Sequence, residues 1–243
     1  MQEGTRKKAP ATGVFDCVAS LPLSISGVPV QAHPSGVLYV EQAATLIVAD
    51  LHLEKGSSFA EKQIFLPPYD TARTLKSLKA ALSGFQPKRV IALGDSFHDG
   101  GGPSRLCKSD RQTLNDLVSS VDWIWVAGNH DPALPEDLGG LFCDEATIGK
   151  LVLSHEPREG ATAEIAGHLH PSARVRGRGR SVRKRCFVAN AERLILPAFG
   201  AYTGGLNVRD VAFAPHFPEA DFHAYMMGSE KLFPVAASAC LPG

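Results

Sequence analysis

Seven polar residues follow short apolar stretches of the sequence, and all are of types that bind metal ions. The stretches LIVA, VIALG, IWVAG, LVLS and EIAG are followed in turn by Asp50, Asp95, Asn129, His155 and His168. His52 and His170 each come two residues after the first donor of their stretch. One such ending is usually a turn or cap residue. Five endings in one chain indicate a shared site.

The spacing of these residues predicts that they converge. In α/β sheets, binding sites form outside the carboxyl ends of the strands. Side chains two residues apart in an extended chain point the same way. Asp50 with His52, and His168 with His170, can therefore each present two donors to one side. We expect all of these side chains to face one crevice.

The donor types indicate which metals would bind. Two carboxylates, four imidazoles and one amide oxygen, without a thiolate, suit manganese, iron, zinc or cobalt. Seven donors exceed the needs of one ion and fit two ions that share a carboxylate, about 3.5–4 Å apart. Two divalent ions, two carboxylates and a bridging hydroxide leave about one net positive charge, which favours a phosphate ester. We expect a hydrolase with two divalent ions, manganese being preferred.

The elements that must position these residues alternate between strands and helices in the first part of the chain. The periodicities predict strands at 37–41, 45–50, 89–95 and 122–129, and helices at 69–82 and 110–118. This order predicts a largely parallel sheet covered by helices. After residue 140, short β-rich stretches predict a second sheet, mixed or antiparallel.

Composition narrows the class of protein. The 243 residues include 25 basic and 25 acidic residues, so no net charge draws the whole molecule to DNA or to an anionic membrane. No apolar stretch approaches the roughly 18 residues of a membrane span, and the first residues are too polar for a signal peptide. The five scattered cysteines fit neither a disulfide framework nor a structural zinc site. We expect a cytoplasmic protein.

The same residues resemble the signature of the calcineurin-like metallophosphoesterase superfamily. It reads here ADLHLEKG, LGDSFHD, GNHD, SHEP and GHLH, in the family's order. The resemblance implies an α/β fold, a four-layer αββα sandwich of two mixed sheets flanked by helices. It implies a partly flexible segment at 1–30, the metallophosphoesterase domain at 31–225, and a packed or flexible tail at 226–243. It also implies one metal on Asp50, His52 and His170, a second on Asn129, His155 and His168, and Asp95 as the bridge.

The family pattern also implies catalytic roles beside the metals. A metal-bridging hydroxide attacks phosphorus in line, and His130 protonates the departing oxygen or stabilises phosphoryl charge. Asp131 either orients that imidazole or raises its pKa, or it instead caps a helix before Pro132. Asp99 lies one residue later than the family's second block usually has it, so its role, and that of His98, stay open.

Longer strings, such as DLHLEKGSSFAEKQIFLPPYDT and LPAFGAYTGGLNV, most resemble the bacterial ligase-associated DNA damage response endonuclease (PdeM) group. This resemblance implies a phosphodiesterase or endonuclease that acts on DNA in repair, with a functional link to a DNA ligase. Two alternatives stay open: a phosphodiesterase or phosphomonoesterase for small molecules, and a non-catalytic scaffold of the same fold. The scaffold is disfavoured because every donor position and His130 are present.

Two further segments are candidates for substrate contact. Seven of the twelve residues from Arg174 to Arg185 are basic. This stretch either contacts nucleic-acid phosphates or forms a solvated turn, and its candidate contacts are Arg174, Arg176, Arg178 and Arg180. Residues 56–69 form either a wall of the site, with Phe59 or Tyr69 as stacking surface, or a packed surface loop.

Overall fold

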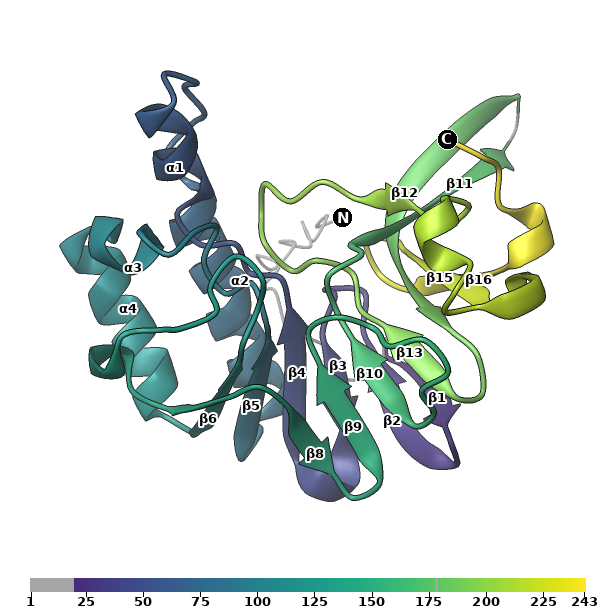
Figure 1. Ribbon diagram of the computed structural model, residues 1–243, viewed down its shortest axis with the longest axis horizontal. Helices are drawn as coiled ribbons and strands as arrows, with labels where there is room; N and C mark the ends of the chain where they lie inside the picture. The colour runs from purple at the N-terminus through teal and green to yellow at the C-terminus, as the bar shows by residue number, and fades with distance from the viewer. Residues whose placement is uncertain (1–19, 178) are drawn as a thin grey trace, which may run out of the picture.

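Two mixed β-sheets lie face to face in the computed structural model, which describes residues 20–177 and 179–243 (Figure 1). The first sheet has seven strands, in the spatial order β1 (Leu21–Ile25), β2 (Val28–Ala32), β3 (Leu38–Val40), β4 (Thr45–Ala49), β5 (Arg89–Leu93), β6 (Asp122–Val126) and β7 (Leu141–Cys143). Strands β1 to β4 pair antiparallel, and β4 to β7 pair parallel. The parallel part predicted from the sequence is therefore confirmed.

Helices cover the outer face of this sheet (Figure 1). They are α1 (Lys55–Glu61), α2 (Asp70–Phe85), α3 (Gly102–Arg105) and α4 (Lys108–Ser119). Two connections contain the 3₁₀ helices η2 (Glu41–Ala43) and η3 (Glu136–Leu138). Side chains alternate along the strands, so that Leu46 and Val48 pack under the helices while Ile47 and Ala49 face the second sheet. Both faces of β4 are thus buried, and its carboxyl end is held firmly.

Helix α1 occupies part of the segment that could have been a packed loop. Its first turn is tied to α2, because the Gly56 N–H donates to Asp70 Oδ2 at 2.8 Å. The Glu54 carboxylate accepts from Thr71 Oγ1 at 2.9 Å and from Ser57 Oγ at 2.7 Å. These contacts link residues up to seventeen positions apart, so local sequence periodicity does not reveal them.

The second sheet contains nine strands. Its main path is β14 (Leu206–Asn207), β11 (Pro171–Gly177), β12 (Arg180–Ala189), β13 (Arg193–Ile195), β10 (Glu164–Ala166), β9 (Leu151–Ser154) and β8 (Ala146–Ile148). Strand β15 (His223–Met227) pairs with β12, and β16 (Leu232–Ala236) pairs with β15. Strand β10 runs parallel to both β9 and β13, whereas β11 and β12 are antiparallel. The sheet is mixed, as expected.

The fourth layer differs from the expected α-helices. In the described part of the chain, the outer face of the second sheet packs against short 3₁₀ helices and loops. The 3₁₀ helices are η4 (Val211–Phe213), η5 (Pro218–Ala220) and η6 (Ala237–Ala239). Pro215 and Pro218 lie three residues apart, which prevents a longer helix there. Phe213, Phe217 and Phe222 fill the layer instead.

The two ends of the described chain belong to the sheets. Ile25 and Val30, on β1 and β2, are buried between the sheets. Ala237 and Cys240 are buried on the outer face of the second sheet. Residues 1–19 lie outside the described part, and the boundaries expected at residues 30 and 225 stay predictions. No helix within the described residues is long and apolar enough to cross a membrane.

A buried ion pair fixes the strand that leads to the two C-terminal donors. Glu164 on β10 lies opposite Arg193 on β13. Their side chains are 0% and 3% exposed, and Arg193 Nε lies 2.8 Å from a Glu164 carboxylate oxygen. The guanidinium also donates to the carbonyls of Ala161 and His216. Because both charges are removed from water, each needs the other to offset its loss of hydration.

We predict that Glu164→Gln lowers the free energy of unfolding by about 3 kcal/mol, because it leaves the Arg193 charge buried without its partner. Urea denaturation in the presence of EDTA measures this effect without metal binding. The exposed Glu159→Gln is the control and should change the free energy by less than about 0.5 kcal/mol. Equal midpoints for the two variants would contradict the prediction.

Candidate metal centre

All seven predicted donors lie together, at the carboxyl ends of strands from both sheets. The first sheet contributes Asp50 and His52 after β4, Asp95 after β5, and Asn129 after β6. The second sheet contributes His155 after β9, and His168 and His170 after β10. The contacts between these side chains show two groups, which share one carboxylate.

The first group consists of Asp50, His52 and His170. His170 Nε2 lies 3.2 Å from Asp50 Oδ1 and 3.1 Å from His52 Nε2. One ligand atom from each residue falls within 4.8 Å of the others. This grouping is the one that the family resemblance implies for one metal.

The second group consists of Asn129, His155 and His168. Asn129 Oδ1 lies 2.9 Å from His155 Nε2 and 3.0 Å from His168 Nδ1. The two imidazole nitrogens are 3.2 Å apart. An amide oxygen and two ring nitrogens thus crowd around one position, where they could hold a second ion.

Asp95 lies between the two groups. Its Oδ2 is 3.6 Å from His52 Nε2 in the first group. Its Oδ1 is 3.4 Å from His155 Nε2 in the second. One carboxylate therefore reaches both donor groups, as a pair of ions sharing a bridging ligand requires.

The backbone at these positions is strained. Five of the seven residues have left-handed backbone conformations, with φ of 55° at Asp50, 41° at His52, 46° at Asp95, 67° at His168 and 45° at His170. Each such conformation costs roughly 1 kcal/mol for a residue other than glycine. The chain accepts this cost because the left-handed turn directs a side chain from the strand end into the crevice.

Two glycines make room for the donors. A Cβ on Gly94 would lie 2.2 Å from His155 Nδ1, and one on Gly128 would lie 2.1 Å from the Asp95 backbone nitrogen. Neither position can accept a side chain without moving a donor. Gly94 therefore lets His155 of the second sheet approach the first sheet, and Gly128 lets the segments after β5 and β6 approach one another.

Electrostatics at the centre favour a bound cation. Burial and the charge of His170 lower the pKa of His52 to about 3. Burial and the charge of His155 likewise lower the pKa of His168. Neutral imidazoles offer a lone pair to a metal. Burial opposes ionisation of Asp95, but the hydrogen bond and charge of His155 hold the pKa of Asp95 at about 2.

His155 shows the demand for positive charge at the centre. Burial alone would lower its pKa, but the hydrogen bond to Asp95 and the charge of Asp50 raise the pKa of His155 to about 9. The carboxylates thus attract a proton where a metal cation would supply the same charge. The donor set fits two divalent ions.

His130 borders the centre and has a defined orientation. Its backbone N–H donates to Asp95 Oδ1 at 2.9 Å, and its Nδ1 lies 2.8 Å from the His98 carbonyl oxygen. A carbonyl only accepts, so Nδ1 must carry hydrogen and Nε2 is the nitrogen that can exchange a proton. The side chain is 41% exposed, and Nε2 lies 3.9 Å from Asp95 Oδ2.

Asp131 contacts the backbone beside His98. It is 1% exposed, and its Oδ2 accepts from the Phe97 N–H at 2.9 Å. Burial raises the pKa of Asp131 to about 7. The hydrogen-bond partner of the His130 imidazole is the His98 carbonyl, so any orienting effect of Asp131 on His130 acts through the segment Phe97–His98.

The structure places the two residues whose roles were open. Asp99 accepts from Arg105 Nη2 with both oxygens, at 2.7 and 2.8 Å, and so ties the loop to α3. His98 lies at the edge of the centre, with its Nδ1 3.4 Å from His52 Nδ1. Phe59 packs against the His98 ring at 5.6 Å between centroids. Tyr69 is 67% exposed.

The basic stretch forms the hairpin of β11 and β12. Arg174 and Arg176 alternate with Ala173 and Val175, which pack into the outer core, so the two arginines project from the opposite face. Arg180 pairs with Gly177, on the face of Ala173 and Val175. Arg180 therefore lies on the opposite face of the hairpin to Arg174 and Arg176. Arg178 lies outside the described residues.

Sequence reasoning missed a loop from the second sheet that supports the centre. The Gly200 N–H donates to the Asp50 carbonyl at 3.1 Å, and the Phe199 N–H donates to the Ala49 carbonyl at 2.8 Å. These bonds hold the end of β4 from the other sheet. The string LPAFGAYTGGLNV marked this loop by resemblance only, because nothing in its composition reveals a contact about 150 residues away.

We predict that His170→Ala removes about one of two manganese ions per chain, because it takes one of the three donors from the first group. Metal analysis after purification with manganese measures the ratio. His223→Ala, an exposed histidine outside the centre, is the control and should keep the wild-type ratio. Full metal content in His170→Ala would show that His170 is not a ligand.

The chain is similar to proteins of known family and known structure. The calcineurin-like phosphoesterase family model matches residues 44–159. The crystal structure of the Pseudomonas putida nuclease MPE is 25% identical in sequence, with a TM-score of 0.68, covering 89% of this chain and 100% of that chain. Yfce, a phosphoesterase from E. coli, is 13% identical with a TM-score of 0.38, covering 79% of this chain and 98% of that chain. No curated protein matches the chain.

The family match spans the segments that supply Asp50, His52, Asp95, Asn129 and His155. The likeness to the nuclease extends over the second sheet, from which His168 and His170 project. Residues 44–159 therefore match the calcineurin-like phosphoesterase family, and the comparisons support a metal-dependent phosphoric ester hydrolase.

Proposed function

We propose that this protein is a phosphodiesterase that cleaves DNA with two bound divalent ions, manganese in its native form. The observation that carries the proposal is the position of Asp95, whose carboxylate reaches one donor group at 3.6 Å and the other at 3.4 Å. A single shared carboxylate between two groups of donors is the arrangement that two-metal hydrolysis needs.

When bound, the two ions would lower the pKa of a water molecule and neutralise the oxygens of the phosphate. The chain's own residues prepare the site for them. Asp50 accepts the His168 N–H at 3.1 Å, so the carboxylate is fixed before an ion binds. The His155 ring is fixed between the Leu93 carbonyl at 3.2 Å and Asn129. Preorganised donors avoid reorganisation during the reaction.

His130 is placed to handle the proton of the leaving oxygen. The His98 carbonyl holds Nδ1, which leaves Nε2 facing the centre and open to solvent. A substrate alkoxide that departs from this side would meet Nε2 as a proton donor. Asp131 acts as a positioning residue, because it holds the Phe97 backbone next to that carbonyl.

The shape of the molecule favours a long substrate over a small one. The α1 segment and the β11–β12 hairpin rise on either side of the strand ends, so that the centre lies between two raised arms (Figure 1). Arg174 and Arg176 project from the same face as Arg183, which donates to Ser172 Oγ and to the Gly205 carbonyl. This face borders the loop that contacts Asp50, so phosphates leading away from the centre would meet it.

The proposed biological setting is DNA repair beside a DNA ligase, in the cytoplasm. Two observations support it: the motif strings most resemble the ligase-associated endonuclease group, and the fold resembles a nuclease over 89% of this chain. Metal-dependent cleavage of a phosphodiester is the reaction that both imply.

We predict that His130→Ala lowers kcat by about 10²–10⁴-fold on DNA while leaving metal content near the wild-type value, because His130 assists the leaving group without binding an ion. A manganese-supplemented assay compares supercoiled plasmid, single-stranded DNA and a small chromogenic phosphodiester.

The controls distinguish a loss of catalysis from a loss of bound metal. Asp95→Asn should lose activity together with metal, whereas His223→Ala should retain both. A His130→Ala protein that loses an ion would place His130 among the ligands, beside His52 and His98. Cleavage of the small diester with no cleavage of either DNA would favour the small-molecule alternative.

We also predict that replacing both Arg174 and Arg176 by Gln weakens duplex DNA binding and its dependence on salt. Each lost phosphate contact should reduce the slope of log affinity against log salt by about 0.9, so the double variant should lose about 1.8. Fluorescence anisotropy titrations at several salt concentrations measure this slope. An unchanged slope would remove this face of the hairpin from the binding surface.

A further inference from the structure

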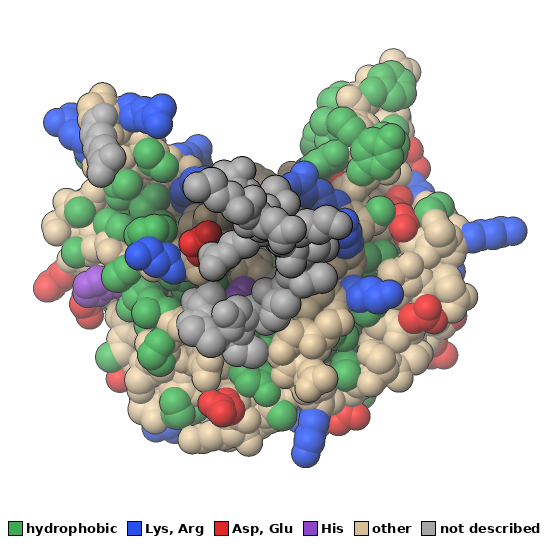
Figure 2. Space-filling model, turned by 180° about the vertical axis from the view of Figure 1, so that it is seen from behind, with side chains coloured by type: hydrophobic (Ala, Val, Ile, Leu, Met, Phe, Trp, Pro, Cys, Tyr) green, Lys and Arg blue, Asp and Glu red, His purple; other side chains and the backbone are tan. Residues whose placement is uncertain are grey.

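A cavity of about 460 Å³ lies beside the metal centre, and the proposed mechanism does not use it. It opens between the first turns of α2, strand β12 and the loops around residues 35, 200 and 228. Its charged and apolar lining includes Arg73, Lys184, Arg185, Phe199 and Met227. Figure 2 shows Lys and Arg side chains between the two raised arms, on the side opposite to that of Figure 1.

The cavity has an excess of positive charge. Arg73, Lys184 and Arg185 line it and no acidic residue does, although Lys184 pairs with Ala173 and so projects from the opposite face of β12 to Arg185. Arg185 is fixed, since Nη1 donates to the Ala198 carbonyl at 2.9 Å and Nη2 donates to the Thr203 carbonyl at 3.0 Å. Arg73 forms no ion pair within the part of the chain that the structure describes. Burial and the charge of Arg73 both lower the pKa of Arg185.

Like charges that line one cavity favour a bound anion. A guanidinium is a planar fork of donors that matches the oxygens of a phosphate. Phe199 and Met227 add apolar surface beside the two arginines. A cavity of this size, with a charged side and an apolar side, suits one nucleotide unit.

The loop that lines the cavity also contacts the strand end that carries a metal donor. The Ala201 N–H donates to Thr74 Oγ1 at 3.0 Å in the cavity wall. The preceding N–H, of Gly200, donates to the Asp50 carbonyl at 3.1 Å. Two adjacent residues therefore join the cavity to a metal ligand.

We propose that this cavity binds a second, non-reacting phosphate of the nucleic-acid strand whose scissile phosphate lies at the metal centre. The inference rests on the proposed function and adds to it a binding site in which Arg73 and Arg185 hold the strand at a fixed distance from the cleaved bond. Substrates with several phosphates bind at both places, whereas a substrate with one phosphate binds only at the centre.

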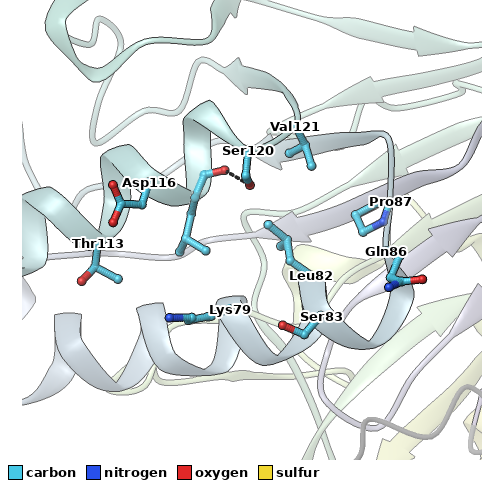
Figure 3. Close-up of a pocket in the computed structure, with 10 residues that line it drawn as sticks. Lys79, Leu82, Ser83, Gln86, Pro87, Thr113, Asp116, Ser120 and Val121 are labelled. Atoms are coloured by element: carbon cyan, nitrogen blue, oxygen red, sulfur yellow. Dashed lines mark hydrogen bonds between the residues drawn. The ribbon is translucent and has the colours of Figure 1, made fainter.

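A second cavity provides an internal comparison. It has about the same volume, 470 Å³, and lies between α2 and α4 (Figure 3). Its charged lining residues are Lys79 and Asp116, one of each sign. Size alone therefore does not distinguish a phosphate site, and Lys79, on the same helix as Arg73, is a matched position for a control.

The test uses the manganese-loaded enzyme with a dinucleoside monophosphate and with an oligonucleotide long enough to reach both sites. Arg73→Gln should raise the KM for the oligonucleotide about tenfold without changing kcat, because a charge-assisted contact is lost in binding. The KM for the dinucleoside monophosphate should stay at the wild-type value. Arg73→Lys, which keeps the charge, should restore part of the affinity, and Lys79→Gln should behave as the wild type.

Each other outcome overturns a defined part of the argument. Equal effects of Arg73→Gln on both substrates, or none on the oligonucleotide, would overturn the second phosphate site while leaving the proposed function intact. A free mononucleotide that alters cleavage of the small diester in the wild type, but not in Arg73→Gln, would mark an effector pocket and overturn the strand path. Failure of the wild-type enzyme to cleave either diester would overturn the proposed function itself.

Discussion

The demand for positive charge among crowded donors is the constraint on which the rest of the structure depends. Asp50 and Asp95 are 0% and 2% exposed, and removal of such carboxylates from water is costly unless a counter-charge is near. The neighbouring imidazoles meet the need only in part, because burial keeps several of them neutral. The second sheet supplies His155, His168 and His170. The two sheets must therefore keep their relative positions for the carboxylates to remain ionised.

The backbone around the centre shows how the fold meets this constraint. Parallel strands end at one edge, and each chain then turns through a left-handed residue that a helix or regular strand would not contain. The strain is tolerated because β4, β5 and the intersheet core are almost fully buried and hold the strand ends in place. Glycines at 94 and 128 let the donors approach one another at distances that any side chain would prevent.

Much of the first sheet and the donor set could be predicted from the sequence, because both leave local signals. Apolar stretches that end in Asp, Asn or His mark strand ends, and the i, i+2 spacing marks donors on one side. Trp123 and Trp125, two residues apart on β6, are both buried in the core as this alternation predicts. The elements that were missed depend on distant contacts. Helix α1 is tied to Asp70 and Thr71, and the 3₁₀ layer follows from where Phe213 and Phe222 pack. The contact of Asp131 with Phe97, and the approach of Arg73 to Arg185, leave no periodic trace in the sequence at all.

The division of the candidate metal ligands between two sheets links metal binding to the stability of the protein. An ion held here would be bound by side chains of both sheets, so its binding free energy would add to the free energy of unfolding. The amount of folded protein is thereby linked to the supply of metal. A shortage of the bound metal would then lower the stability of the fold as well as the activity, and a less stable fold is degraded faster.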